Sequence, residues 1–283
     1  MVKILISADM EGVCGVTSWV QVMPPELGQT PSSTVEYERA RLRLTKEVNA
    51  AAEGAFAAGA SEVIVNDSHD GMRNLVPEEL YEGVRFITGN DKELGMVQGL
   101  QEGVDGLFFV GYHAKAGTPA APLAHTWTGY VQDVRLNGQS TGEFGLNAAI
   151  AGHFDVSVLL VTGDDKAVAQ CQAFSGEAVV GVVVKEGYST FSAIHLHPHK
   201  AQQLIREAAE QAVKTSQAKP WTFPTPCAVE VDFDHQTRAD QCLYLPGVSR
   251  VGERSIGFSA SDALGMNQLF RAMIKASRVQ MSP

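Results

Sequence analysis

Acidic and imidazole side chains follow three predicted strands of this sequence, close to the point where each strand ends. In an open parallel sheet, sites form beyond the carboxyl ends of the strands. Residues two apart in an extended segment point the same way, so Asp9 and Glu11 can converge on one point. We therefore expect one polar site at this edge of the sheet. The side chains that it would collect are Asp9, Glu11, Asp67, His69 and His113.

Two carboxylates with two imidazoles form a mixed oxygen and nitrogen donor set, which suits Zn²⁺ and also accepts Mn²⁺ or Co²⁺. Two further candidates lie downstream: His125, and Glu143 at the start of a predicted helix. Five potential ligands are too many for one tetrahedral zinc and suit two metals that share a bridging carboxylate. Such metals, ~3.5–4 Å apart, clamp a nucleophilic water and polarise a carbonyl. The five candidate ligands are Asp9, Glu11, His69, His113 and Glu143.

Several of these residues have a structural alternative. A carboxylate after a strand often caps a turn, and Asp67 is interpreted in that way. A single histidine after a strand is more often a structural hydrogen-bonding group than a ligand. Cys14 is expected as a small buried residue under the site, and the alternating His195, His197 and His199 as the solvated start of a helix. The metal hypothesis therefore depends on the coincidence of candidates at several strand ends.

Other catalytic motifs are missing from the sequence. It contains no GxSxG elbow of a serine hydrolase, no GxxxxGK[ST] phosphate loop, and no GxGxxG after the first predicted strand. The DMEG segment faintly resembles the aspartyl phosphatases, which place two aspartates two residues apart. Here the second position is Glu11, and that chemistry would leave the histidines without a role.

Strands and helices alternate through the first two thirds of the chain. This alternation favours an α/β fold with a mainly parallel sheet and helices on both faces. Asn137-Gly138 predicts a two-residue hairpin turn inside it. The predicted strands are residues 2–8, 62–65, 83–88, 106–110 and 156–161, and the predicted helices are 34–58, 92–101, 143–153 and 164–173.

After about residue 185 the order is less regular. A strongly amphipathic helix is predicted for 199–214, a Pro-rich connection for 220–226, a strand for 228–233 and a closing helix for 261–276. We therefore predict two domains: a metal-binding α/β domain of residues 1–185, and a smaller α+β C-terminal domain of residues 186–283.

Composition excludes some classes of partner. The formal net charge of the 283 residues is −10, whereas nucleic acids and anionic membranes need clustered Lys and Arg. The N-terminal segment lacks the long apolar stretch of a signal peptide, and no apolar run approaches the ~20 residues of a membrane span. The four cysteines are scattered without a CxxC pair, which favours free thiols and a cytoplasmic location.

Five motifs carry a resemblance to a known family. SADMEG, NDSH, GYHA, the histidine at position 125 and GEFGLNA follow in the order found in the zinc D-aminopeptidases of the bacterial dipeptide-operon type. Similar stretches extend to VLLVTGDDKA. The sequence resembles this family closely over residues 3–185 and more loosely beyond. One tetrapeptide would be unspecific, but five motifs in one order are not.

The resemblance implies a specific metal centre. By analogy, Asp9 bridges two Zn²⁺ ions in each subunit, Glu11 and His69 complete one site, and His113 and Glu143 complete the other. His125 matches the histidine that family members carry near the metals as a catalytic group. The resemblance also implies a ten-subunit ring whose active sites face an interior channel, and short peptide substrates with an N-terminal D-residue, such as D-Ala-D-Ala.

Some positions depart from the family pattern. The spacer between His113 and His125 is one residue longer, the loop 15–33 is longer, and Ser189-Thr190 stands where relatives carry Ser-Arg. These differences concern substrate contacts more than metal ligands. Lys115 is a candidate for holding a substrate carboxylate or oxyanion, with a solvated surface lysine as the alternative.

The expected function is a metallo-aminopeptidase that hydrolyses short peptides with a dizinc-activated water. Two other classes stay open. One is another metal-dependent amidohydrolase that acts on small amides. The other is a non-catalytic small-molecule binding protein in which the metal is structural.

Overall fold

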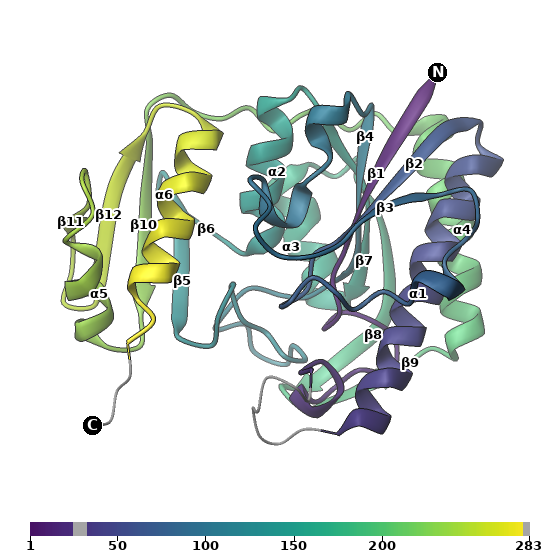
Figure 1. Ribbon diagram of the computed structural model, residues 1–283, viewed down its shortest axis with the longest axis horizontal. Coiled ribbons are helices and arrows are strands. Elements are labelled where there is room, and N and C mark those ends of the chain that lie inside the picture. Colours follow the sequence, from purple (N-terminus) through teal and green to yellow (C-terminus); the bar gives the residue numbers. More distant parts are fainter. Residues whose placement is uncertain (25–32, 280–283) are drawn as a thin grey trace.

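A seven-stranded sheet forms the centre of the larger part of the molecule (Figure 1). The computed structural model describes residues 1–24 and 33–279. The strands lie in the order β3-β2-β1-β4-β7-β8-β9, and every neighbouring pair from β3 to β8 is parallel. The strands are β1 (Val2–Ala8), β2 (Ala60–Asp67), β3 (Arg85–Ile87), β4 (Gly106–Tyr112), β7 (Ser157–Asp164), β8 (Val180–Ser189) and β9 (Ser192–His195). The predicted mainly parallel sheet is confirmed, with β9 as its antiparallel edge.

Helices cover both faces of this sheet, as predicted. On one face α1 (Thr34–Ala57) packs against α4 (Pro198–Thr215), and on the other lie α2 (Glu143–His153) and α3 (Asp165–Ser175) (Figure 1). The pleat of β1 explains the division, because successive side chains point to opposite faces. Ile4 and Ile6 join the core under α1 and α4, whereas Leu5 joins the core that contains α2.

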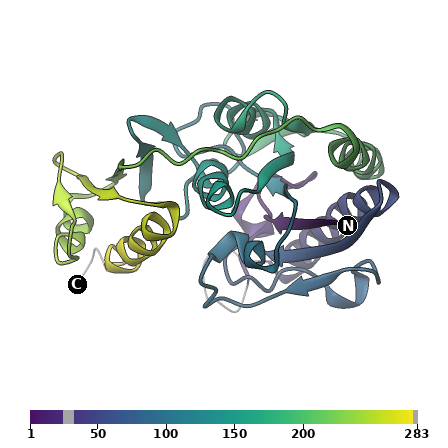
Figure 2. The ribbon, with the colours of Figure 1, turned by 90° about the horizontal axis from the view of Figure 1, so that it is seen from above.

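A second, antiparallel sheet lies beyond α2 and α3 (Figure 2). Its order is β11-β12-β10-β5-β6. The predicted hairpin is confirmed, since β5 and β6 pair around Asn137 and Gly138, which adopt φ values of +47° and +80°. Its elements are β5 (Val131–Leu136), β6 (Gln139–Thr141), β10 (Cys227–Phe233), β11 (Ser249–Arg250) and β12 (Ser255–Ala260), with α5 (Gln236–Cys242) and α6 (Ala263–Ala276) packed against them.

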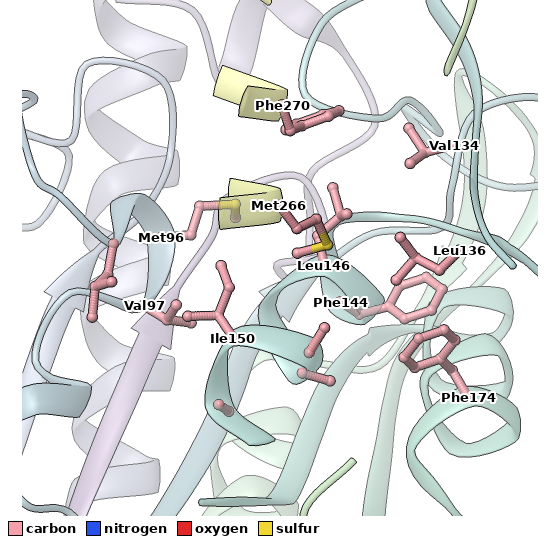
Figure 3. Packing of buried hydrophobic residues seen from close by; sticks show 14 of the residues in the cluster. Met96, Val97, Val134, Leu136, Phe144, Leu146, Ile150, Phe174, Met266 and Phe270 are labelled. Carbon is pink, nitrogen blue, oxygen red and sulfur yellow. The ribbon is translucent and has the colours of Figure 1, made fainter. Parts of the chain in front are cut away.

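Side chains from α6 join the second sheet to the first. Met266 and Phe270 of α6 belong to the same buried cluster as Met96 and as Leu146 of α2 (Figure 3). The second sheet therefore rests on α2 through a continuous apolar core.

Both sheets use chain from each side of residue 185, the predicted domain boundary. β5 and β6 precede that residue and pair with β10, whereas β9 and α4 follow it and pack on the first sheet. The division into two domains at this residue stays a prediction. Local sequence pattern carries no signal for a strand pairing such as β5 with β10, whose partners lie about a hundred residues apart.

The prediction of a helix for residues 92–101 is wrong. The chain forms two 3-10 turns instead, Gly95–Val97 and Leu100–Glu102, separated by Gly99 at a φ of +115°. A Cβ at Gly99 would lie 2.8 Å from Leu5 Cδ1, so this close, left-handed crossing over β1 needs glycine. Within residues 1–24 and 33–279, no helix has the length and apolarity to cross a membrane.

Candidate metal centre

Three neighbouring strands bring the predicted residues to one edge. β1 lies between β2 and β4, and Ala8 at its end is in register with Asp67 and Val110. The segments that follow these strands carry Asp9, Glu11, His69 and His113, and Glu143 opens α2 beside them. The expected convergence of strand ends is therefore observed.

The DMEG segment crosses the end of β4 at very close range. The N–H of Gly12 donates to the carbonyl of Gly111 at 2.8 Å. A Cβ on Gly12 would lie 1.9 Å from the carbonyl oxygen of Tyr112, so only glycine fits. This crossing holds the segment that carries Asp9 and Glu11 directly beside His113.

Asp9 lies at the centre of the cluster. Its Oδ1 is 3.3 Å from Nδ1 of His69, and its Oδ2 is 3.5 Å from Nε2 of His113. Each imidazole also faces a second carboxylate. His69 Nδ1 lies 3.0 Å from Oε2 of Glu11, and His113 Nε2 lies 3.3 Å from Oε1 of Glu143. The cluster thus consists of two histidine–carboxylate pairs, one on each side of Asp9.

The outward nitrogens of the imidazoles are occupied by backbone carbonyls. His69 Nε2 donates to Val22 O at 2.8 Å, and His113 Nδ1 donates to Ala114 O at 2.9 Å. With the N–H directed outward, the other ring nitrogen faces the cluster, where it offers a lone pair once a metal displaces its proton. This is how metal-binding histidines are held in proteins, because the outer hydrogen bond selects the tautomer and orients the ring.

Two buried carboxylate oxygens support a cation at this place. Asp9 and Glu11 are each 2% exposed. Asp9 Oδ2 and Glu11 Oε2 have no hydrogen-bond partner within the described part of the chain. Burying such an oxygen without compensation is costly. Oxygen and imidazole nitrogen ligands at converging positions fit Zn²⁺, so the residues present suit the metal that the sequence predicts.

Burial and charge shift the pKa values in the cluster strongly. Burial, with the added negative charge of Glu11, raises the pKa of Asp9 to about 7. Burial acts to raise the pKa of Glu11 as well, but His69 holds it well below its usual range. Burial acts to lower the pKa of His113, but the charge of Glu143 raises it to about 10. Such a concentration of negative charge attracts cations, and protons compete with metals for it.

His125 lies against the cluster on the side of His113. Its ring stacks on that of His113 with a centroid distance of 4.0 Å and an interplanar angle of 14°. Its Nε2 lies 3.7 Å from Glu143 Oε1 and 3.9 Å from Glu11 Oε1, while Nδ1 donates to Leu123 O. Burial, together with the charge of His113, lowers the pKa of His125. A neutral imidazole therefore faces the cluster at neutral pH.

Asp67 does not join the cluster. Its carboxylate accepts hydrogen bonds from the N–H groups of Asn74 and Leu75, at 2.5 and 2.7 Å, and from the Asn74 amide. The interpretation of Asp67 as a turn cap is confirmed. Lys115 lies 3.6 Å from Asp133 and is partly exposed, and it does not line the cavity over the cluster.

The alternating histidines are more varied than expected. His197 caps α4 by accepting the N–H of His199, as a helix start should. His195, however, is half-buried and accepts the N–H of Gly15 at 3.0 Å, next to Cys14. Cys14 itself is buried, as expected.

A cavity of about 1080 Å³ opens over the cluster. Asp9, Glu11, His69, His125 and Glu143 lie in its wall. Most of the other lining residues have no signal in the sequence, because they come from distant segments and form no motif. Those with the largest side chains are Trp19, Met23, Met72, Arg73, Met96, Trp127, Tyr130, Arg238 and Arg278.

The whole chain is similar to known D-aminopeptidases in sequence and in structure. A family model described as D-aminopeptidase matches residues 2–272. A D-aminopeptidase of Bacillus subtilis (strain 168) is 34% identical over 281 residues, which cover 99% of this chain and 98% of the relative. The solved structure of a zinc-dependent D-aminopeptidase from Bacillus subtilis, DppA, described as a self-compartmentalizing protease, matches with a TM-score of 0.91 and 32% identity, over 100% of both chains. The expected family is confirmed, and this chain belongs to the D-aminopeptidases.

Proposed function

We propose that this chain removes the N-terminal residue of short peptides, and that its substrates carry an N-terminal D-residue, as in D-Ala-D-Ala. The observation that carries the proposal is the cluster of histidine–carboxylate pairs around Asp9 on the wall of a large cavity. The relatives that match over the full length are named D-aminopeptidases, which supports the D-specificity.

Two Zn²⁺ ions are the proposed cofactor. Asp9 would bridge them, Glu11 and His69 would complete one site, and His113 and Glu143 the other. The two separate oxygens of Asp9, each directed at a different imidazole, support this division. The solved relative is described as zinc-dependent. When bound, the zinc pair polarises the substrate carbonyl and lowers the pKa of a bound water towards ~7.

His125 is the proposed proton-transfer group. Its Nδ1 is engaged by Leu123 O, so Nε2 is the atom that can take up or release a proton in the cavity. The lowered pKa leaves that atom unprotonated at neutral pH, as a proton acceptor requires. Trp19 contacts the His125 ring edge-on at 5.3 Å, which helps to fix the ring plane.

The cavity suits a short peptide with a free C-terminus. Arg73 and Arg278 line it, together with Arg238, whose guanidinium is already paired with Asp234. Outside the metal cluster, the single acidic lining residue among those described is Asp70. The guanidinium groups of Arg73 and Arg278, in a chain of net charge −10, favour a ligand whose far end is a carboxylate.

The proposed assembly is a homo-oligomer, and specifically a ring of ten subunits. The solved relative is described as a self-compartmentalizing protease, which supports an assembly. The large apolar side chains Tyr188, Phe191 and Ile194 are exposed on β8, β9 and their connection, which suits a subunit contact. The proposed location is the cytoplasm, supported by four free, buried cysteines.

A substrate panel tests the function. We expect zinc-loaded protein to hydrolyse D-Ala-D-Ala, to act far more weakly on L-Ala-L-Ala, and to leave N-acetyl-D-Ala-D-Ala intact because it lacks a free amine. Hydrolysis of the acetylated peptide would favour another amidohydrolase. Binding of peptides without turnover of any panel member, at full zinc content, would favour the non-catalytic binding protein.

A further inference from the structure

A buried lysine lies under the loop that carries Glu11. Lys185 belongs to β8 and is 1% exposed, although it is not one of the predicted site residues. An ammonium group can be buried at this depth only when its donors are satisfied, because desolvation of the charge is expensive.

All three protons of Lys185 are directed at one loop. Its Nζ donates to the backbone carbonyls of Glu11, Val13 and Val16, at 2.5, 3.1 and 2.7 Å. An ammonium group has three donors and no acceptor, so these bonds use its full capacity. The first acceptor belongs to a residue whose carboxylate lies in the metal cluster.

Acceptor groups complete the support of the same loop. Glu47, which is 2% exposed, accepts the N–H of Cys14 at 2.9 Å, and His195 accepts the N–H of Gly15 at 3.0 Å. Side chains therefore bind both kinds of backbone group in this loop. Glu47 and His195 accept its N–H groups, and Lys185 donates to its carbonyls.

We propose that Lys185 is a positioning residue that sets the Glu11 carboxylate for one of the two metals. The inference depends on the proposed zinc centre. Lys185 acts through the backbone of Glu11 and touches neither the cavity nor the pair formed by His113 and Glu143. Its loss should therefore weaken one zinc site and spare the other.

The test is zinc binding by Lys185→Met, measured by chelator competition on the refilled protein. We expect one of two zincs to bind ~10–100-fold more weakly, the range for loss of a group that orients a ligand, and the other to bind as in the wild type. Two zincs at wild-type affinity would overturn the proposal, and so would equal weakening of both.

A second variant covers the case in which Lys185→Met does not fold. Lys185→Arg keeps the charge but presents a planar fork, which does not direct three donors at three converging carbonyls. We expect the same selective weakening of one zinc, and wild-type affinity for both would overturn the positioning role of the ammonium.

Arg135→Met is the matched control for general loss of stability. Arg135 is a partly buried cation of the second sheet that pairs with Asp133, Glu230 and Asp232, away from the Glu11 loop. It should lower the unfolding temperature of the zinc-free protein without changing either zinc affinity, and selective loss of one zinc in this control would also overturn the proposal. Wild-type protein that binds no zinc would instead refute the proposed function.

Discussion

The two histidine–carboxylate pairs on either side of Asp9 consist of the same chemical groups, but different parts of the fold hold them in place. His69 with Glu11 and His113 with Glu143 have closest approaches of 3.0 and 3.3 Å. Glu11 lies on a loop whose backbone is held by side chains from α1, β8 and β9. Glu143 opens a helix, and its Oε1 accepts the N–H of Trp127 at 2.7 Å.

One ligand set can thus combine a half whose backbone is rigidly held with a half that contacts the proposed proton-transfer group. The backbone of the Glu11 loop is fixed by Lys185, Glu47 and His195. Both carboxylates lie at similar distances from His125 Nε2, 3.9 Å for Glu11 and 3.7 Å for Glu143. What distinguishes the Glu143 side is that the His125 ring stacks on His113, and that Glu143 accepts the N–H of Trp127, which lines the cavity. We therefore expect changes on the Glu11 side to act chiefly on metal retention, and changes on the Glu143 side to act on retention and turnover together.

Asp9→Ala should have the largest effect, because Asp9 contacts both pairs. We expect loss of both zincs and a fall in kcat/KM on the order of 10³-fold or more, the scale of removing the electrostatic stabilisation of a reaction. Metal analysis and D-Ala-D-Ala hydrolysis measure the two effects. Full activity in this variant would refute a shared bridging carboxylate.

Glu11→Gln and Glu143→Gln should separate the two sides. Each replaces a proposed ligand by a neutral group of the same size, so each should retain one zinc and lose at least ~100-fold in affinity for the other, the upper end of the range for outer groups. Cobalt substitution, followed by absorption spectroscopy, distinguishes the remaining sites. Identical spectra for the two variants would mean that the pairs are not separate sites.

His125→Ala should affect turnover alone. We expect kcat to fall by ~10²–10⁴-fold, as for loss of a general acid or base, while zinc content stays at the wild-type level. His153→Ala is a suitable control, since His153 lies at the end of α2 and does not line the cavity. Unchanged turnover would remove His125 from the chemistry.

His195→Gln should have the smallest effect, on stability at acid pH. Burial, with the charges of Lys185 and Arg43, lowers the pKa of His195 from 6.5 to about 4. The unfolded chain then binds more protons between these values, so folded-state stability falls as the pH falls from 6.5 to 4. In zinc-free protein, the unfolding temperature of the variant should decline less over this range than that of the wild type. An equal or steeper decline would contradict the assignment.

The strand-end residues of the site could be predicted from the sequence for a physical reason. Parallel strands bring their carboxyl ends to one edge, so Asp9, His69 and His113 needed only a correct strand assignment. The hairpin at Asn137 followed from local turn chemistry in the same way. The division of the candidates between two metals came from the family resemblance, because spacing alone does not specify it.

The contacts that hold the Glu11 loop in place could not be predicted in this way. Lys185 meets the carbonyl of Glu11 across 174 positions of sequence, and no local pattern records such a contact. The pairing of β10 with β5 is equally non-local. The error at residues 92–101 has a local origin, since a helical pattern of side chains was interrupted by Gly99, whose backbone must pass close to Leu5.

The dizinc centre is tested most directly by a zinc titration of metal-free protein, with D-Ala-D-Ala hydrolysis followed at each step. We predict no activity without metal, two zincs bound per subunit, and full activity only as the second site fills. Full activity in protein freed of metal by chelation would contradict a zinc-dependent reaction.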